Sequence, residues 1–350
     1  MRETRHLQSS ETFIGAKDLA ADRSPSRIGG FVLTPGSTAN GRSFGIVGVG
    51  PVGSILAGHL ARHGQHVVLV DILKTHLDTI RTKGLTIAGY AKFNVKIPDV
   101  CYSIPDLKGW AVDAVFICVK ASILPRILSD VKAATKPGTY AISFQNGLDT
   151  EQLISEKFGA DRTLRCVVNY AGNILGDGHV DMTFFNKPNY VGTISKEADD
   201  YAKQIAQILT SCELDSEFTD NIRKYTWEKT ILNAGMSALC AITKQMMKDA
   251  MDFGYTRQIV EGLVKEGIEV AKACGFDYGP GFFDFCMGYL GKAGRHKPSM
   301  LVDVENNRPT EIDFLNGKIA EHGASLDIPT PYNQTVTAIV KALEAGYKRA

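Results

Sequence analysis

Short apolar runs alternate with longer amphipathic stretches over the part of the chain that begins near residue 44. The first two runs, 44–47 and 66–70, have the length of strands, and a glycine turn and a helical stretch over 54–62 separate them. Further strand-like runs follow at 84–87, 114–119 and 139–143, and a helix over 123–134 joins the last two. This alternation predicts a mainly parallel, doubly wound α/β sheet.

The pattern changes after about residue 220, where strand-like runs give way to long helical stretches. Helices are predicted over 225–244, 255–273, 309–322 and 334–343. Between the two regions lie three more apolar runs, 166–172, 179–185 and 190–194, which we expect to complete the first sheet. A chain of 350 residues is too long for one comfortable core. We therefore expect an α/β domain over 43–220 and an all-helical domain over 221–350.

The segment before the first strand, residues 1–42, has neither apolar periodicity nor the apolar stretch of a secretory signal. It is rich in Ser, Gly and Arg, and we interpret it as a disordered extension. Recurrent arginines would suit an organelle-targeting peptide, but Glu3, Glu11, Asp18 and Asp22 argue against that alternative.

Composition narrows the class of partner. Lysine and arginine number 39 against 38 acidic residues, so a net charge of +1 offers no broad field for nucleic acid or an anionic membrane. No apolar run approaches the roughly 20 residues of a membrane helix. The seven cysteines are scattered and, like the eight histidines, lack zinc-site spacing, which predicts no metal and reduced core thiols. A cytoplasmic protein with a small-molecule partner is the expectation.

A glycine-rich turn directly follows the first strand and opens a helix. Its six residues are Gly48, Val49, Gly50, Pro51, Val52 and Gly53, which have the form G-x-G-x-x-G. In this setting the first glycine permits the tight turn, the second lets a pyrophosphate approach the backbone, and the third lets helix and strand pack closely. A tight turn without a ligand is the alternative. The strand–turn–helix context favours a dinucleotide-binding, Rossmann-type domain.

An acidic residue, Asp71, ends the second strand 23 residues beyond Gly48. At that place a carboxylate can accept hydrogen bonds from both ribose hydroxyls of an adenosine and would repel a 2′-phosphate. This favours NAD(H), while NADP(H) stays open because Lys74 stands three residues on. In the alternative interpretation Asp71 only caps a helix that begins near Ile72.

Two further groups of polar residues stand where a site is expected. Lys229, Asn233 and Ser237 are spaced by four and share one face of a helix. Lys120 and Asn146 follow the carboxyl ends of parallel strands, the edge at which open α/β sheets place ligands. In the alternative interpretation Lys229 is a surface lysine that pairs with Glu228 or Asp220. For Asn146 the alternative is a simple Asn-Gly turn.

Several motifs together resemble the ketopantoate reductase family, in which a Rossmann domain precedes a helical domain and the active site lies between them. Beyond the glycine turn they are Val-Lys-Ala at 119–121, Gln-Asn-Gly at 145–147, Trp-Glu-Lys at 227–229 with Asn233, and Ser-Met-Leu-Val-Asp at 299–303 leading to Arg-Pro-Thr-Glu-Ile-Asp at 308–313. The resemblance runs from residue 44 nearly to the C-terminus.

The resemblance implies roles for these residues. Lys229 would be the general acid that protonates the alkoxide as hydride reaches a ketone, and Glu311 would organise the lysine and the substrate. Asn233, Ser237, Ser299 and Lys120 would bind substrate, while Lys120 and Asn146 would also lie near the nicotinamide ribose. For Glu311 a helix-dipole role after Pro309, and for Ser299 a helix N-cap, remain as alternatives.

The chain departs from the best-known pattern at Ser237, where such reductases have a second asparagine. The expected reaction is reduction of 2-dehydropantoate to pantoate in pantothenate biosynthesis. Because a serine offers one amide contact fewer and more room, an NAD-dependent dehydrogenase of another branched or aromatic 2-hydroxy acid, of the D-mandelate type, is the alternative. A non-catalytic nucleotide-sensing protein is a third hypothesis. A homodimer is expected from the resemblance alone.

Overall fold

The computed structural model describes residues 41–347 of the chain. The disordered extension predicted over 1–42 therefore falls, apart from its last two residues, outside the described residues. None of the helices between 41 and 347 combines the length and the apolarity that a bilayer crossing needs.

An eight-stranded sheet forms the centre of the first domain, in the order β12-β11-β8-β7-β6-β1-β2-β5. Its strands are β1 (Ser43–Val47), β2 (His66–Val70), β5 (Val100–Cys101), β6 (Ala114–Ile117), β7 (Tyr140–Ser143), β8 (Thr163–Val167), β11 (Asn189–Thr193) and β12 (Ser216–Phe218). All neighbours are parallel except β11 and β8. The predicted Rossmann-type, doubly wound sheet is confirmed.

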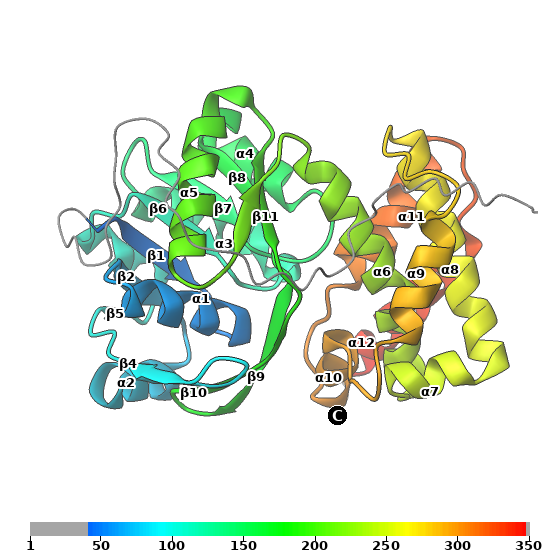
Figure 1. Ribbon diagram of the computed structural model, residues 1–350, viewed down its shortest axis with the longest axis horizontal. Coiled ribbons are helices and arrows are strands. Elements are labelled where there is room, and N and C mark those ends of the chain that lie inside the picture. Colours follow the sequence, from blue (N-terminus) through cyan, green and yellow to red (C-terminus); the bar gives the residue numbers. More distant parts are fainter. Residues whose placement is uncertain (1–40, 348–350) are drawn as a thin grey trace, which may run out of the picture. The chain divides into compact units, whose positions relative to one another are not determined.

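Helices cover both faces of this sheet (Figure 1). α1 (Pro51–Arg62) and α5 (Asp199–Ser211) pack into one apolar core, and α3 (Leu124–Ala134) and α4 (Thr150–Phe158) into another. The central strands β6, β7 and β8 are consequently buried along nearly their whole length. The mainly apolar sequences of these strands, with Arg165 of β8 as the charged exception, follow from this double cover.

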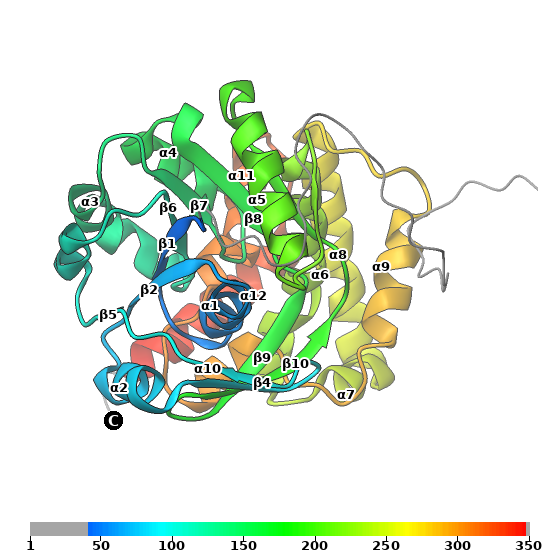
Figure 2. The same cartoon turned by 60° about the vertical axis from the view of Figure 1, so that its left-hand side comes forward.

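A second, four-stranded sheet has the order β4-β3-β10-β9. Its strands are β3 (Leu85–Gly89), β4 (Phe93–Val95), β9 (Tyr170–Gly176) and β10 (His179–Phe185). Placing the runs at 84–87 and 179–185 in the first sheet was therefore wrong, and the run predicted over 166–172 divides between β8 of the first sheet and β9 of this one. β3 and β10 alternate buried and more exposed residues, which suits a sheet with only one covered face. α1 lies between β2 of the first sheet and the strands of this one (Figure 2), and α2 (Lys74–Lys83) packs on β3.

The chain from Ile222 to the end of the described residues contains helices and no strand, as predicted. The α-helices are α6 (Ile222–Thr243), α7 (Met247–Asp252), α8 (Gly254–Ala273), α9 (Phe282–Gly291), α10 (Ser299–Glu305), α11 (Asn316–Ser325) and α12 (Pro331–Gly346). The 3₁₀ turns among residues 41–347 are η1 (Ile104–Gly109), η2 (Ala121–Ile123), η3 (Ala160–Arg162), η4 (Lys196–Ala198) and η5 (Ile312–Phe314). α6 contacts α8, α10 and α12 around a core that buries Trp227.

One predicted helix, over 309–322, is wrong as a single element. The chain forms η5, breaks at Leu315, where φ is −106° and ψ is −99°, and only then begins α11. A continuous helix would have needed helical angles at Leu315. The break leaves Glu311 before a short turn rather than inside a long helix, so that its side chain can reach Ala121, which follows β6 of the first domain.

The glycine turn after β1 has the geometry that its sequence predicts. Gly48 has a φ of +98°, and a Cβ there would lie 2.6 Å from the Val119 nitrogen. A Cβ on Gly53 would lie 2.0 Å from the Gly48 carbonyl oxygen, whereas a Cβ on Gly50 would meet nothing within 4 Å. The first and third glycines are thus required by the fold, and the second faces open space.

Replacing Gly53 by alanine should lower the free energy of unfolding by about 1–3 kcal/mol, since its methyl group has to push α1 away from the turn. Gly50→Ala is the matched control: its methyl group meets nothing within 4 Å, so it should cost clearly less stability than Gly53→Ala, namely the small loss expected for alanine at a helix N-cap. Urea unfolding of the two variants beside the wild type measures this. Equal stability of both variants would contradict the packing role of Gly53.

Candidate active site

Asp71, at the carboxyl end of β2, is tied to the glycine turn. Its Oδ2 accepts from the Val49 nitrogen at 2.6 Å and its Oδ1 from the Leu73 nitrogen at 3.0 Å. The following helix α2 begins at Lys74 with Leu73 as its N-cap residue and no side-chain cap. Asp71 therefore braces the turn instead of capping a helix that starts at Ile72.

The segments that follow β6 reach across to the helical domain. Lys120 forms an ion pair with the largely buried Asp303 of α10 and donates to the Pro309 carbonyl oxygen at 3.3 Å. The next residue, Ala121, donates its backbone N–H to Oε1 of Glu311 at 3.0 Å. Two neighbouring residues of the first domain thus fix the segment that precedes η5.

Glu311 is a half-buried carboxyl group between the two domains. Burial raises its pKa, while the N–H of Ala121, the charge of Lys120 and a hydrogen bond from the Asn146 side chain work in the opposite direction. Because these contacts direct the carboxylate to the edge of the sheet, a helix-dipole role for Glu311 does not describe its surroundings.

The loop after β7 is more than a simple turn. Gly147 has a φ of +90°, and a Cβ there would lie 2.5 Å from the Phe314 carbonyl oxygen, which accepts from the Leu148 nitrogen at 2.9 Å. Gln145 donates its side-chain amide to the Val119 carbonyl oxygen at 2.9 Å. The loop therefore joins the ends of β6 and β7 to η5 and holds Asn146 beside Glu311.

Lys229 points from α6 to the end of β8, where its Nζ donates to the Val168 carbonyl oxygen. Desolvation, followed by the positive charge of Arg165, lowers its pKa from 10.5 to about 8, while Cys166 and Glu311 act in the opposite direction. Lys229 is half-buried, and it donates to a backbone oxygen rather than to Glu228 or Asp220. The surface-pair interpretation does not fit this surrounding.

The remaining predicted substrate residues lie on two helices in mutual contact, α6 and α10. Asn233, one turn beyond Lys229, is half-buried, and Ser237, two turns beyond it, is 7% exposed. Ser299 is exposed as the first residue of α10, and Pro298 is the N-cap residue there. The N-cap alternative for Ser299 is therefore wrong. Lys120, Asn146, Glu311 and Lys229 are brought together, with Ser299 at the open end of α10.

Sequence reasoning missed two charged residues of this region. Asp303, the partner of Lys120, stands inside the motif at 299–303 but was not singled out. Arg165 lies on β8 and is 2% exposed. The sequence feature that could have indicated it is a single arginine among mainly apolar residues.

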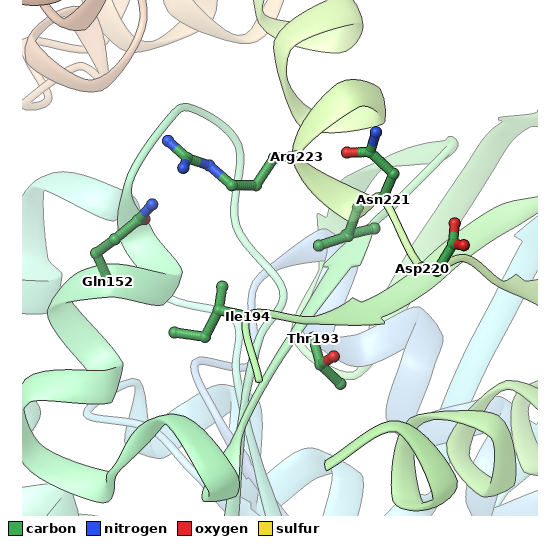
Figure 3. Close-up of a pocket in the computed structure, with 7 residues that line it drawn as sticks. Gln152, Thr193, Ile194, Asp220, Asn221 and Arg223 are labelled. Atoms are coloured by element: carbon green, nitrogen blue, oxygen red, sulfur yellow. The ribbon is translucent and has the colours of Figure 1, made fainter. Parts of the chain in front are cut away.

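A cavity of about 320 Å³ lies elsewhere, between the start of α6, α4 and the end of β11 (Figure 3). Arg223 extends there toward Gln152. Its lining is Gln152, Thr193, Ile194, Asp220, Asn221, Ile222 and Arg223, none of them among the predicted site residues. Among residues 41–347, no group of three or more His, Cys, Asp or Glu side chains is arranged to hold a metal ion.

Both domains match one protein family. Residues 44–196 match the family described as ketopantoate reductase PanE/ApbA, and residues 221–344 match its C-terminal counterpart. The chain belongs to the ketopantoate reductase family.

Individual relatives agree with this assignment. A 2-dehydropantoate 2-reductase of Streptococcus pyogenes serotype M18 is 27% identical over 302 residues, which are 86% of this chain and 97% of the relative. A PanE/ApbA family ketopantoate reductase from Ralstonia eutropha JMP134 superposes with a TM-score of 0.78 at 26% identity, over 87% of this chain and 99% of its own. A D-mandelate dehydrogenase solved with NADH and anilino(oxo)acetate superposes with a TM-score of 0.79 at 25% identity, over 87% of this chain and 99% of its own.

The lowered pKa of Lys229 predicts a stability difference that depends on pH. Between about pH 8 and 10.5 the unfolded chain retains a proton that the folded chain has released at Lys229. The free energy of unfolding therefore increases as the pH rises through this window. Across this pH window the free energy of unfolding of the wild type should increase by at most about 3 kcal/mol relative to that of Lys229→Met. Urea unfolding at a series of pH values tests this, with exposed Lys224→Met as control. A constant difference between wild type and Lys229→Met would refute the shift.

Proposed function

We propose that this protein is a nicotinamide-dependent reductase of a 2-oxo acid, with 2-dehydropantoate as the first candidate substrate and pantoate as its product. The main support is the half-buried Lys229, whose pKa is lowered to about 8, beside Glu311 at the carboxyl edge of a Rossmann-type sheet. Membership of the ketopantoate reductase family supports the same reaction.

The glycine turn fits a dinucleotide. The open space at Gly50 lies at the N-terminus of α1, where unpaired backbone N–H groups and the helix dipole favour a pyrophosphate. Asp71 stands beside the turn as the expected acceptor for an adenosine ribose, which favours NAD(H) in this proposal. Lys120 and Asn146 are the proposed contacts near the nicotinamide ribose.

The bound nicotinamide would supply the hydride. As the ketone carbon accepts it, negative charge develops on the carbonyl oxygen, and the Lys229 ammonium stabilises that charge and then transfers its proton to the oxygen. A pKa of about 8 keeps the ammonium protonated at neutral pH while making it a better acid than an exposed lysine. Glu311, held by the Ala121 N–H, keeps a carboxylate near this ammonium and thereby limits the fall of its pKa.

Substrate binding would come mainly from the helical domain. Ser299 and Lys120 are the proposed contacts to the carboxylate, and Asn233 and Ser237 to the side chain. In this proposal residues 43–220 bind the cofactor, and residues 221–350 bind the substrate and pair in a homodimer. A cytoplasmic location remains a prediction.

A second candidate is an NAD-dependent dehydrogenase of a branched or aromatic 2-hydroxy acid. The serine at position 237 favours it, because a shorter side chain leaves more room than an asparagine. The similarity to a D-mandelate dehydrogenase solved with NADH adds weight. Both candidates use the same hydride transfer and the same lysine.

Cofactor and substrate are tested together by following NADH and NADPH oxidation with 2-dehydropantoate, benzoylformate and 2-oxoisovalerate. We expect the highest kcat/KM with 2-dehydropantoate and NADH. A preference for benzoylformate would favour the second candidate, and a preference for NADPH would contradict the role of Asp71. Cofactor binding without reduction of any of these acids would support a nucleotide-sensing protein.

Lys229→Ala should lower kcat by about 10²–10⁴-fold, the usual contribution of a general acid, and leave cofactor binding intact. Lys224→Ala, an exposed lysine on the same helix, is the matched control and should keep wild-type turnover. Steady-state kinetics and NADH fluorescence titration of the two variants measure both quantities. Unchanged turnover in Lys229→Ala would refute the assignment.

A further inference from the structure

Arg165 is a buried charge that the proposed reaction does not use. It lies on β8 and is 2% exposed. Its guanidinium donates to the Ser143 hydroxyl at 2.6 Å, to the Gly147 carbonyl oxygen at 2.9 Å and to the Thr150 hydroxyl. These groups belong to the end of β7, the loop after it and the first residue of α4, so a single side chain links three successive segments.

The ionic partner of Arg165 is imperfectly placed. Oε2 of Glu151, also 2% exposed, lies 3.9 Å from Nε of Arg165, too far for a hydrogen bond. Both of these atoms are buried without a hydrogen-bond partner in the part of the chain that the structure describes. Well-packed apolar residues often match or exceed the stability of a buried ion pair. Stability therefore gives little reason for charges at these two positions, and the bond of Arg165 to the loop that carries Asn146 points to a functional reason.

The first consequence of Arg165 is mechanical. Its bond to the Gly147 carbonyl fixes the loop whose next peptide, at Leu148, donates to Phe314 of η5. The same loop presents Asn146 to Glu311. Since Glu311 stands three residues before Phe314, Arg165 anchors the first-domain side of this contact.

The second consequence is electrostatic. Three charged or titratable groups act on the Lys229 ammonium: Arg165 and Cys166 from β8, and Glu311 from the segment before η5. Apart from burial, Arg165 is the strongest influence that lowers the pKa of Lys229. Burial lowers the pKa of Arg165 itself, whereas the negative charge of Glu151 of α4 and, more weakly, of Cys166, Glu311 and Asp149 raises it and so favours the charged guanidinium. Its guanidinium stays protonated at any working pH, so its effect on Lys229 is permanent.

We propose that Arg165 is a positioning residue of this site, which anchors the Asn146 loop against the Glu311 segment and keeps a permanent positive charge that acts on the Lys229 ammonium. The charge makes the ammonium a stronger acid than burial alone would. This inference rests on the proposed role of Lys229 as proton donor. The effect of the Arg165 charge on the pKa of Lys229, however, is present whether or not a substrate is turned over.

Four variants separate charge from packing. Arg165→Met removes the positive charge and keeps a side chain of similar length. The double variant Arg165→Met/Glu151→Gln removes both buried charges and therefore leaves no unpaired carboxylate if the single variant fails to fold. Glu151→Gln alone keeps the guanidinium. Arg162→Met is the control, because the side chain of Arg162, three residues earlier, is 40% exposed and donates to the Tyr140 hydroxyl rather than to the loop that carries Asn146.

The measurement is the rate of acetylation of Lys229 by acetic anhydride over a pH series, read from the peptide that contains it by mass spectrometry. The wild type should give a pKa of about 8. Arg165→Met and the double variant should raise it toward the ordinary value of 10.5. Glu151→Gln should leave it unchanged or lower it, and Arg162→Met should leave it unchanged.

The pH profile of kcat gives an independent readout. In the reductive direction the loss of activity at high pH should move upward in Arg165→Met, because Lys229 holds its proton longer. If Arg165 were merely structural, Arg165→Met would lower kcat without shifting either the pKa of Lys229 measured by acetylation or the pH at which kcat declines. An unchanged Lys229 pKa in Arg165→Met and in the double variant would overturn the proposal. Shifted labelling in a protein that reduces no 2-oxo acid would instead refute the proposed function and leave the inference standing.

Discussion

The hydrogen bond from the Ala121 N–H to the Glu311 carboxylate is the contact on which the rest of the site depends. It joins the carboxyl edge of the parallel sheet to the helical domain, and the ion pair of Lys120 with Asp303 and the close approach of Gly147 to Phe314 reinforce it. Only with this segment in place does the charge of Glu311 act on Lys229. The break at Leu315 has its explanation here, since a continuous helix would have kept Glu311 within its own turns.

The site gathers charges that water would solvate better. Burial lowers the pKa of Lys229, raises that of Glu311 and opposes the charge of Arg165, so each of these groups costs stability in the folded state. Active sites require such groups because a proton donor has to release its proton near the working pH. The two large apolar cores on the faces of the sheet and the one around α6 supply the stability that offsets this cost.

The secondary structure was largely readable from apolar periodicity, but the partners of the strands were not. The runs at 84–87 and 179–185 were recognised as strands and then assigned to the wrong sheet. Their alternating burial distinguishes them from the fully buried β6 and β8, and this difference was present in the sequence. Which strand each one pairs with depends on α1, which separates the two sheets.

By itself the sequence determined the fold class, the glycine turn, the position of Asp71 and the helical face with Lys229, because each depends on local periodicity or short-range spacing. It indicated Glu311 only through a family resemblance. The tertiary structure alone decided that Lys120 pairs with Asp303, that Glu311 reaches Ala121 and that the charge of Arg165 acts on Lys229. These contacts join residues far apart in the chain, and a pKa depends on burial and neighbouring charges that only a folded chain defines.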